Sequence, residues 1–218
     1  DRVPKVDYRQ LQATAPELCA DDECFDEIML RGLHERIAQL PAERRARGVV
    51  VFMHQMGSHG PAYYKRTPAG FKKFMPECTT NALQQCPREQ VVKAFDNTIL
   101  YTDHFLASAI DWLKQRDNQW APAMVYLSDH GESLGENNLY LHGLPYRFAP
   151  DVQKHVPWIF WLSPTFEQQS GVKLDFLARQ QGEKLSHDHY FHSTLGLLGV
   201  QTQVHDPARD VFPSCRAG

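Results

Sequence analysis

The sequence predicts an α/β fold with a mostly parallel central sheet flanked by helices, and three observations support this prediction. Short, continuous apolar runs occur at residues 49–53, 123–127 and 156–162. Such runs are typical of strands that are covered on both faces. A strongly helical pattern at residues 88–115 separates the first two runs. This order indicates βαβ units, so we expect the 218 residues to form one α/β unit.

The N-terminal region predicts an irregular lead-in followed by a helix. Residues 1–20 are polar, and a helical pattern then runs from Asp21 until Gly48 ends it. Acidic residues in its first turn and arginines near its end suit the helix dipole. The apolar positions recur three or four residues apart, at Phe25, Ile28, Met29, Leu33, Ile37 and Leu40.

A long loop is expected at residues 54–87, because this stretch is rich in Gly, Pro, Tyr and Lys. Pro87 suits the start of the helix at residues 88–115. We expect the apolar face of that helix to consist of Val92, Phe95, Ile99, Phe105, Leu106, Ile110 and Leu113. A last helix is expected at about residues 186–199.

Composition excludes several classes of protein. The formal net charge of −3 gives no overall basic field for binding nucleic acid. No run approaches the roughly 18 apolar residues that a membrane-spanning helix needs, and the polar start is not a signal peptide. We therefore expect the chain as given to be soluble, which leaves open a membrane-tethered parent protein.

Five cysteines are present, four of them in two close pairs. Cys19 and Cys24 form one pair, Cys78 and Cys86 the other, and neither has the spacing of a structural zinc site. Local disulfides in an oxidising compartment and unpaired thiols in the cytosol are both compatible with this spacing. Cys215 has no obvious partner.

The second apolar run ends in an unusual group of ligand-type side chains. Asp129 and His130 follow it directly, and Gly131 permits the turn that would aim both at one metal ion. A carboxylate oxygen and an imidazole nitrogen suit zinc, although a strand-ending turn with an incidental histidine is the alternative. Glu132 is a candidate acid–base group or partner of a metal-bound histidine, whereas Glu136 is expected to be a surface acid.

Further histidines follow the strand ends. His54 and His59 come after the first apolar run, and His142 lies in a glycine-flanked loop after the second. Sites in open α/β sheets form beyond the carboxyl ends of the strands, so these loops are expected to converge. In the histidine-rich segment at residues 186–192 a helix cap is the favoured interpretation, with His187 as the one candidate worth testing.

Taken together, these motifs resemble the bacterial phosphoethanolamine–lipid A transferases, the enzymes behind polymyxin resistance. The resemblance rests on HQMGSHGPAY from His54, on SDHGESLGEN from Ser128 and on YLHG from Tyr140. It covers most of the chain. It implies a fold of the alkaline-phosphatase and sulfatase type that faces the periplasm, with local disulfides Cys19–Cys24 and Cys78–Cys86.

The resemblance also implies the roles of the site residues. Asp129 and His130 match zinc ligands, with one tightly bound Zn²⁺ in the complete domain and a second ion left open. Glu132, His59 and His142 are then the catalytic candidates. His54, His59 and His142 are the candidates for binding substrate.

In the family that this sequence resembles, a threonine nucleophile and a glutamate zinc ligand precede the region matched here. Residues 1–218 are therefore expected to be the C-terminal portion of the catalytic domain. The implied reaction takes phosphoethanolamine from phosphatidylethanolamine and passes it to a lipid A phosphate. We expect a monomer on the periplasmic face of the inner membrane, held there by an N-terminal transmembrane region outside this sequence, without nucleic acid.

Three alternatives stay open. The acceptor is another lipopolysaccharide or glycan group, the protein is a phosphate or sulfate hydrolase of the same superfamily, or the chain is a non-catalytic fragment.

Overall fold

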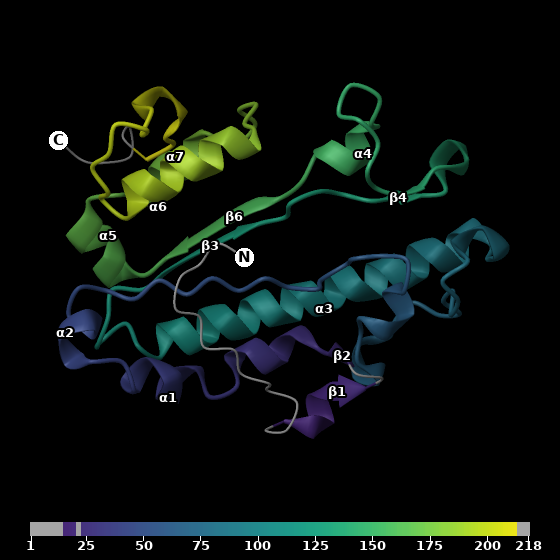
Figure 1. Cartoon of the computed structure of the whole chain (residues 1–218), viewed down its shortest axis with the longest axis horizontal. Helices are drawn as coiled ribbons and strands as arrows, with labels where there is room; N and C mark the ends of the chain where they lie inside the picture. The colour runs from purple at the N-terminus through teal and green to yellow at the C-terminus, as the bar shows by residue number, and fades with distance from the viewer. Residues whose placement is uncertain (1–14, 21–22, 213–218) are drawn as a thin grey trace. The chain divides into compact units, whose positions relative to one another are not determined.

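The computed structural model describes residues 15–20 and 23–212. The chain divides into two compact units, the first formed by Asp1–Ala107 with Leu134–Leu141 and the second by Ser108–Ser133 with His142–Gly218. Figure 1 shows the helices and strands. Cys215 lies outside the described residues, as do residues 1–14 of the expected lead-in.

The first unit is built from short elements around the long helix α3 (Arg88–Lys114), which continues into the second unit. Strands β1 (Cys19–Ala20) and β2 (Glu23–Cys24) pair antiparallel, and the disulfide between Cys19 and Cys24 joins them. The other elements are η1 (Pro16–Leu18), η2 (Asp26–Leu30), α1 (Leu33–Ala38), α2 (Ala42–Arg45), η3 (Tyr63–Lys65), η4 (Ala69–Phe71), η5 (Leu83–Gln85), η6 (Glu136–Asn138) and β5 (Tyr140–Leu141). β5 pairs with β4 (Ser133–Leu134), which begins in the second unit.

The prediction of one helix from Asp21 to Gly48 is wrong for the described part of that range. The structure has three short helices there, η2, α1 and α2. Gly32 adopts a left-handed backbone with φ of 62°, which ends η2 before α1 begins. Pro41, extended with ψ of 138°, separates α1 from α2 because it has no N–H to continue the helix.

Helix α3 confirms the long helix expected at residues 88–115, but its buried face was partly misjudged. The buried apolar side chains are Val91, Ala94, Tyr101, Phe105 and Ala109, which recur at helical spacing. Ile99, expected on this face, is 48 % exposed. The two polar residues before it, Asn97 and Thr98, are buried instead, because their side chains form hydrogen bonds to neighbouring segments.

The core of the first unit lies between α3 and the loops that cross it. Tyr63, Cys78, Leu83, Val91, Ala94 and Leu134 form it, and the ring of Phe95 meets Tyr63 edge-on with centroids 5.5 Å apart. The disulfide Cys78–Cys86 closes the loop over this core. Both cysteine pairs thus form the local disulfides that the resemblance implied.

A buried polar network ties the loop before the second cysteine pair to α3. Asn97 Oδ1 accepts hydrogen bonds from the backbone N–H groups of Lys73 and Phe74, both at 2.9 Å. Its Nδ2 donates to Glu77 Oε2 at 2.9 Å, and the Lys72 ammonium donates to the other oxygen of Glu77 at 2.6 Å. The side chain of Glu77 is only 2 % exposed, so the buried charge is fully paired.

The second unit contains β3 (Ala123–Leu127) and β6 (Trp158–Leu162), which confirm two of the three predicted strands. They pair antiparallel along their whole length, from Ala123 opposite Leu162 to Leu127 opposite Trp158. α4 (Asp151–Lys154), α5 (Pro164–Ser170), α6 (Leu174–Arg179), α7 (His187–Leu197) and η7 (Pro207–Arg209) complete the unit. Its core comprises Leu162, Val172, Val211 and Phe212, with Phe160 edge-on against Phe212. α7 confirms the last predicted helix.

The first predicted strand is not formed in the described chain. Residues 49–53 have no strand assignment, and Val49, Val50, Val51 and Phe52 are 40 to 77 % exposed. Apolar runs of this kind become strands when partners cover both faces, and here the run has no paired strand. Among the described strands, β1 with β2 and β3 with β6 pair antiparallel rather than parallel.

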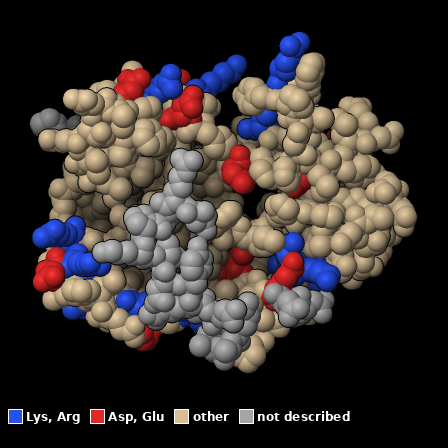
Figure 2. Space-filling view, in the orientation of Figure 1, with Lys and Arg blue, Asp and Glu red and all other residues tan. Residues whose placement is uncertain are grey.

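The surface carries mixed charge. On the face shown in Figure 2, Lys and Arg side chains and Asp and Glu side chains occur in small separate groups among uncharged residues. Within the described residues, no helix combines the length and apolarity needed to cross a membrane.

Replacing Asn97 tests the polar network. Asn97→Ala removes the acceptor of two buried backbone N–H groups, so we expect the free energy of unfolding to fall by about 2 kcal/mol or more. Ile99→Ala, an exposed site on the same helix, is the matched control and is expected to change it by about 0.5 kcal/mol. Urea denaturation of the chain measures both, and equal losses would show that the network adds nothing.

Candidate metal centre

The segment after β3 is held by the backbone of α4. The Gly131 N–H donates to the carbonyl oxygen of Gln153 at 3.0 Å, and the Gln153 side chain donates to Ser133 Oγ at 2.8 Å. Ser133 is fully buried and Gln153 is 6 % exposed. A Cβ on Gly131 would lie 2.0 Å from the carbonyl oxygen of Val152, so this close approach requires glycine. The segment is thereby fixed on both sides of Glu132.

Glu132 and His142 form the central contact of this site. The Glu132 side chain is 4 % exposed, and its Oε1 lies 3.0 Å from His142 Nδ1. A carboxylate only accepts, so the hydrogen is on Nδ1 and the lone pair of a neutral His142 is on Nε2. The backbone turns on both sides of His142, with φ of 64° at Leu141 and 100° at Gly143.

His130 lies directly against His142. Their rings stack with centroids 3.7 Å apart and planes inclined by 29°. His130 Nδ1 lies 3.1 Å from the carbonyl oxygen of Gly131, which can only accept, so Nδ1 is again the donor. Both imidazoles therefore offer Nε2 as a metal-binding atom, with the other nitrogen held by an oxygen, as is usual for metal-binding histidines.

The donor set fits a divalent metal ion such as zinc. One ligand atom each from His130, Glu132 and His142 lies within 4.8 Å of the other two. Asp129 approaches His130, with its Oδ2 3.8 Å from His130 Nε2. Two ligands of one tetrahedral zinc ion, each at about 2.0–2.1 Å, are about 3.3 Å apart. A small movement of the exposed Asp129 side chain therefore brings both atoms to one ion.

His187 at the start of α7 reaches the same segment. Its Nε2 lies 3.1 Å from the Ser128 carbonyl oxygen, while the Ser128 hydroxyl donates to the His130 carbonyl oxygen at 2.8 Å. The capping box of α7 is formed by Ser186 and His189. His187 is thus free of the cap, and it supports the backbone that carries Asp129 and His130.

His54 and His59 belong to the first unit, whereas His130, Glu132 and His142 belong to the second. The predicted role of His54 and His59 in binding substrate stays a prediction. The loop between them is well anchored, since the His59 N–H donates to the Met56 carbonyl oxygen at 3.0 Å and the hydroxyls of Ser58 and Thr98 lie 2.7 Å apart.

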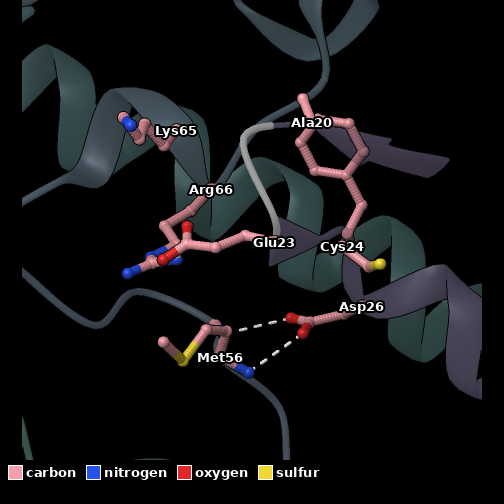
Figure 3. A pocket seen from close by; sticks show the side chains of 9 residues that line it. Ala20, Glu23, Cys24, Asp26, Met56, Lys65 and Arg66 are labelled. Atoms are coloured by element: carbon pink, nitrogen blue, oxygen red, sulfur yellow. Dashed lines mark hydrogen bonds and ion pairs between the residues drawn. The ribbon is translucent and has the colours of Figure 1, made fainter. Parts of the chain in front are cut away.

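Asp26 in η2 holds this loop, and the sequence analysis did not single it out. Its carboxylate accepts from the backbone N–H groups of Met56 at 2.9 Å and of Gly57 at 3.0 Å, as Figure 3 shows for the pocket that these residues line. Asp26 is 8 % exposed. Arg66 adds a second anchor, because it pairs with Glu23 and donates to the His59 carbonyl oxygen at 3.3 Å. A lone aspartate in a helical pattern carries no sequence signal for such a contact.

Glu136 is a bound acid, although it was expected to be a simple surface acid. Its Oε1 lies 2.7 Å from the Arg88 guanidinium, and its Oε2 accepts from the Leu134 N–H at 2.6 Å. Partial burial acts to raise its pKa, but hydrogen bonds from backbone N–H groups and from Arg88 outweigh burial and lower the pKa below the usual value. Glu136 therefore stabilises the turn between β4 and β5 in its ionised form.

Comparisons with known proteins identify the family. A family model described as Sulfatase matches residues 1–200. The chain belongs to the sulfatase family. The soluble domain of lipooligosaccharide phosphoethanolamine transferase A from Neisseria meningitidis superimposes with a TM-score of 0.88 at 38 % identity, over 100 % of this chain and 63 % of that one. The sulfatase-type α/β fold is thereby confirmed.

Two curated members give the same result. The phosphoethanolamine transferase EptA of Salmonella typhimurium is 46 % identical over 99 % of this chain and 38 % of its own length. The phosphatidylethanolamine transferase Mcr-1 of Escherichia coli is 41 % identical over 79 % of this chain and 31 % of its own length. The predicted resemblance is confirmed. The chain spans less than two fifths of the length of these relatives.

Substituting Gly131 tests the packing of the metal centre. Gly131→Ala forces the new Cβ against the Val152 carbonyl, so we expect a loss of about 1–3 kcal/mol in the free energy of unfolding. Zinc affinity should fall with it, since His130 and Glu132 flank the glycine. Thermal unfolding and zinc titration against a chromophoric chelator measure the two effects.

The matched control is Gly70→Ala, because no atom lies within 4 Å of the Cβ built there. It should leave zinc affinity unchanged. A Gly131→Ala chain with unaltered stability and zinc affinity would contradict the close approach.

Proposed function

We propose that the protein is a zinc-dependent phosphoethanolamine transferase that modifies a phosphate of lipid A. The observation that carries this proposal is the cluster of His130, Glu132 and His142 beside Asp129, in a chain 46 % identical to a phosphoethanolamine transferase. The donor is phosphatidylethanolamine. The reaction breaks the phosphate ester bond to diacylglycerol and forms a phosphoanhydride bond to the lipid A phosphate, and diacylglycerol leaves after its oxygen takes up a proton.

Asp129 and His130 are the proposed zinc ligands. His130 would bind through Nε2, since its Nδ1 is engaged by the Gly131 carbonyl, and Asp129 through Oδ2. When bound, the zinc ion would act as a Lewis acid that stabilises negative charge on phosphoryl oxygens. We assign no residue of this chain to the nucleophile.

His142 is proposed to hold or move a proton at the phosphoryl group through Nε2. Its side chain is 31 % exposed, so substrate has access to it. Glu132 is too deeply buried to meet substrate freely, and it acts through the hydrogen bond that fixes the orientation of the His142 ring.

His54 and His59 are proposed to bind the anionic phosphate of the substrate. Their loop is held by Asp26 and by Arg66, and both histidines are exposed. Imidazoles on a fixed loop suit an anionic group, because they donate hydrogen bonds in either protonation state.

The disulfides and the proposed reaction support a location in the periplasm. Cys19–Cys24 and Cys78–Cys86 suit an oxidising compartment such as the periplasm. The related lipooligosaccharide phosphoethanolamine transferase A of Neisseria meningitidis is an integral membrane protein. We propose a monomer at the periplasmic face of the inner membrane, acting on two lipids and on no nucleic acid. Adding phosphoethanolamine places a cationic amine on lipid A, which weakens its attraction for cationic polymyxins.

An acceptor on the lipopolysaccharide core is the second candidate. The Kdo(2)-lipid A phosphoethanolamine 7''-transferase of Salmonella typhimurium is 29 % identical over 80 % of this chain. The higher identity to EptA favours lipid A.

Expression of the full-length gene product in a strain without its own transferase tests the proposal. Mass spectrometry should detect phosphoethanolamine on lipid A, and Asp129→Ala and His130→Ala should reduce it by about 100-fold or more, with loss of zinc. Asp175→Asn, an exposed acid on α6, is the control and should leave transfer unchanged.

Unaltered zinc content and transfer in both site variants would refute the assignment of the metal centre. Phosphoethanolamine found on an inner-core sugar, with unmodified lipid A, would instead establish the second candidate.

A further inference from the structure

A short loop beside the metal centre presents large apolar side chains to solvent. In residues 144–148, which we call the aromatic loop, Leu144 is 39 %, Tyr146 80 % and Phe148 65 % exposed. Val152 on α4 adds a fourth apolar side chain at 46 %. Adjacent apolar residues exposed in this way mark a surface that binds a partner or a membrane.

The aromatic loop is an ordered turn. The N–H groups of Phe148 and Ala149 both donate to the Pro145 carbonyl oxygen, at 2.8 and 3.0 Å. Ala149 is 7 % exposed, and α4 begins two residues after it, at Asp151. Defined backbone hydrogen bonds therefore fix the turn that carries the exposed rings of Tyr146 and Phe148.

Cations accompany both exposed rings. The Arg147 guanidinium lies 4.6 Å from the centroid of the Phe148 ring, and Lys154 Nζ lies 5.2 Å from that of Tyr146. Asp151 offsets one of these charges, since its carboxylate lies 3.4 Å from Lys154 Nζ. The positive charge of Arg147 can therefore bind a lipid phosphate.

The combination of rings and cations matches one surface in particular. Tyr and Phe rings settle at the boundary between lipid headgroups and acyl chains, while Arg and Lys bind lipid phosphates. The exposed run at Val49–Phe52 does not have this combination. It is a continuous apolar run of three valines and a phenylalanine that contains no Lys or Arg, which is the pattern of a strand covered on both faces.

We propose that the aromatic loop docks on the surface of a bilayer that contains anionic phospholipid. His142 of the metal centre lies two residues before Leu144, and the Gln153 carbonyl that holds Gly131 lies in the helix that follows the loop. Docking thus places the metal centre at the depth of the headgroups. This inference rests on the proposed function for its purpose, since both proposed substrates are lipids.

Cosedimentation of the chain with vesicles of phosphatidylethanolamine and phosphatidylglycerol tests the inference. The double variant Tyr146→Ser with Phe148→Ser should lower the affinity for vesicles by about tenfold or more. Arg147→Gln should weaken binding about fivefold at low salt and make little difference at high salt. Circular dichroism checks that each variant keeps its secondary structure.

Phe176→Ser with Arg179→Gln is the matched control. It removes another exposed ring that lies under an arginine, with Arg179 5.3 Å from the Phe176 centroid, and should bind vesicles like the unchanged chain. Failure of the unchanged chain to bind vesicles, or equal losses in the control and the loop variants, would overturn the docking surface.

The same assay separates this inference from the proposed function. Asp129→Ala should bind vesicles normally, because the metal centre takes no part in docking. Transfer by the full-length Asp129→Ala variant would refute the proposed metal centre without touching the vesicle result. Loss of vesicle binding in Asp129→Ala would contradict docking through the aromatic loop.

Discussion

The hydrogen bond between Glu132 and His142 is the constraint on which the metal centre depends. A carboxylate that is 4 % exposed is costly unless it is paired, and the His142 Nδ1–H provides the pairing at 3.0 Å. The contact joins residues ten positions apart and fixes the tautomer that leaves His142 Nε2 available. It also brings His142 against the His130 ring, so one buried acid organises two candidate ligands.

The rest of the centre is arranged so that this acid cannot move. Gly131 lies against the backbone of α4 more closely than any other residue type permits, and Ser133 is bound by the Gln153 side chain. His187 holds the Ser128 carbonyl. These contacts fix the chain on both sides of Glu132, which is the rigidity that a preorganised site needs. The Asp129 side chain, by contrast, is 79 % exposed.

Periodicity and local motifs predicted part of this structure well. The long helix α3, strands β3 and β6 and the last helix α7 carry strong apolar patterns, and all four form in the structure. The motif after β3 indicated Asp129 and His130 as metal ligands, with Glu132 and His142 as catalytic candidates, because acids and histidines follow one strand closely. Contacts local in the chain are the ones that a single sequence reveals.

Contacts between distant segments were beyond such reasoning. The continuous apolar run at residues 49–53 predicted a strand, but a strand also needs a partner, and periodicity says nothing about partners. Ile99 was placed on the buried face of α3 because it is apolar, whereas Asn97 is buried there because loop N–H groups bind it. Asp26 and Gln153 likewise owe their roles to partners about 30 and 20 residues away.

The central claim is that His130 binds zinc through Nε2 together with Asp129. X-ray absorption at the zinc edge of the zinc-loaded full-length protein tests it most directly. The account predicts nitrogen and oxygen ligands at about 2.0–2.1 Å, with imidazole scattering that decreases in His130→Ala. Sulfur ligands at about 2.3 Å, or a spectrum unchanged by His130→Ala, would contradict it.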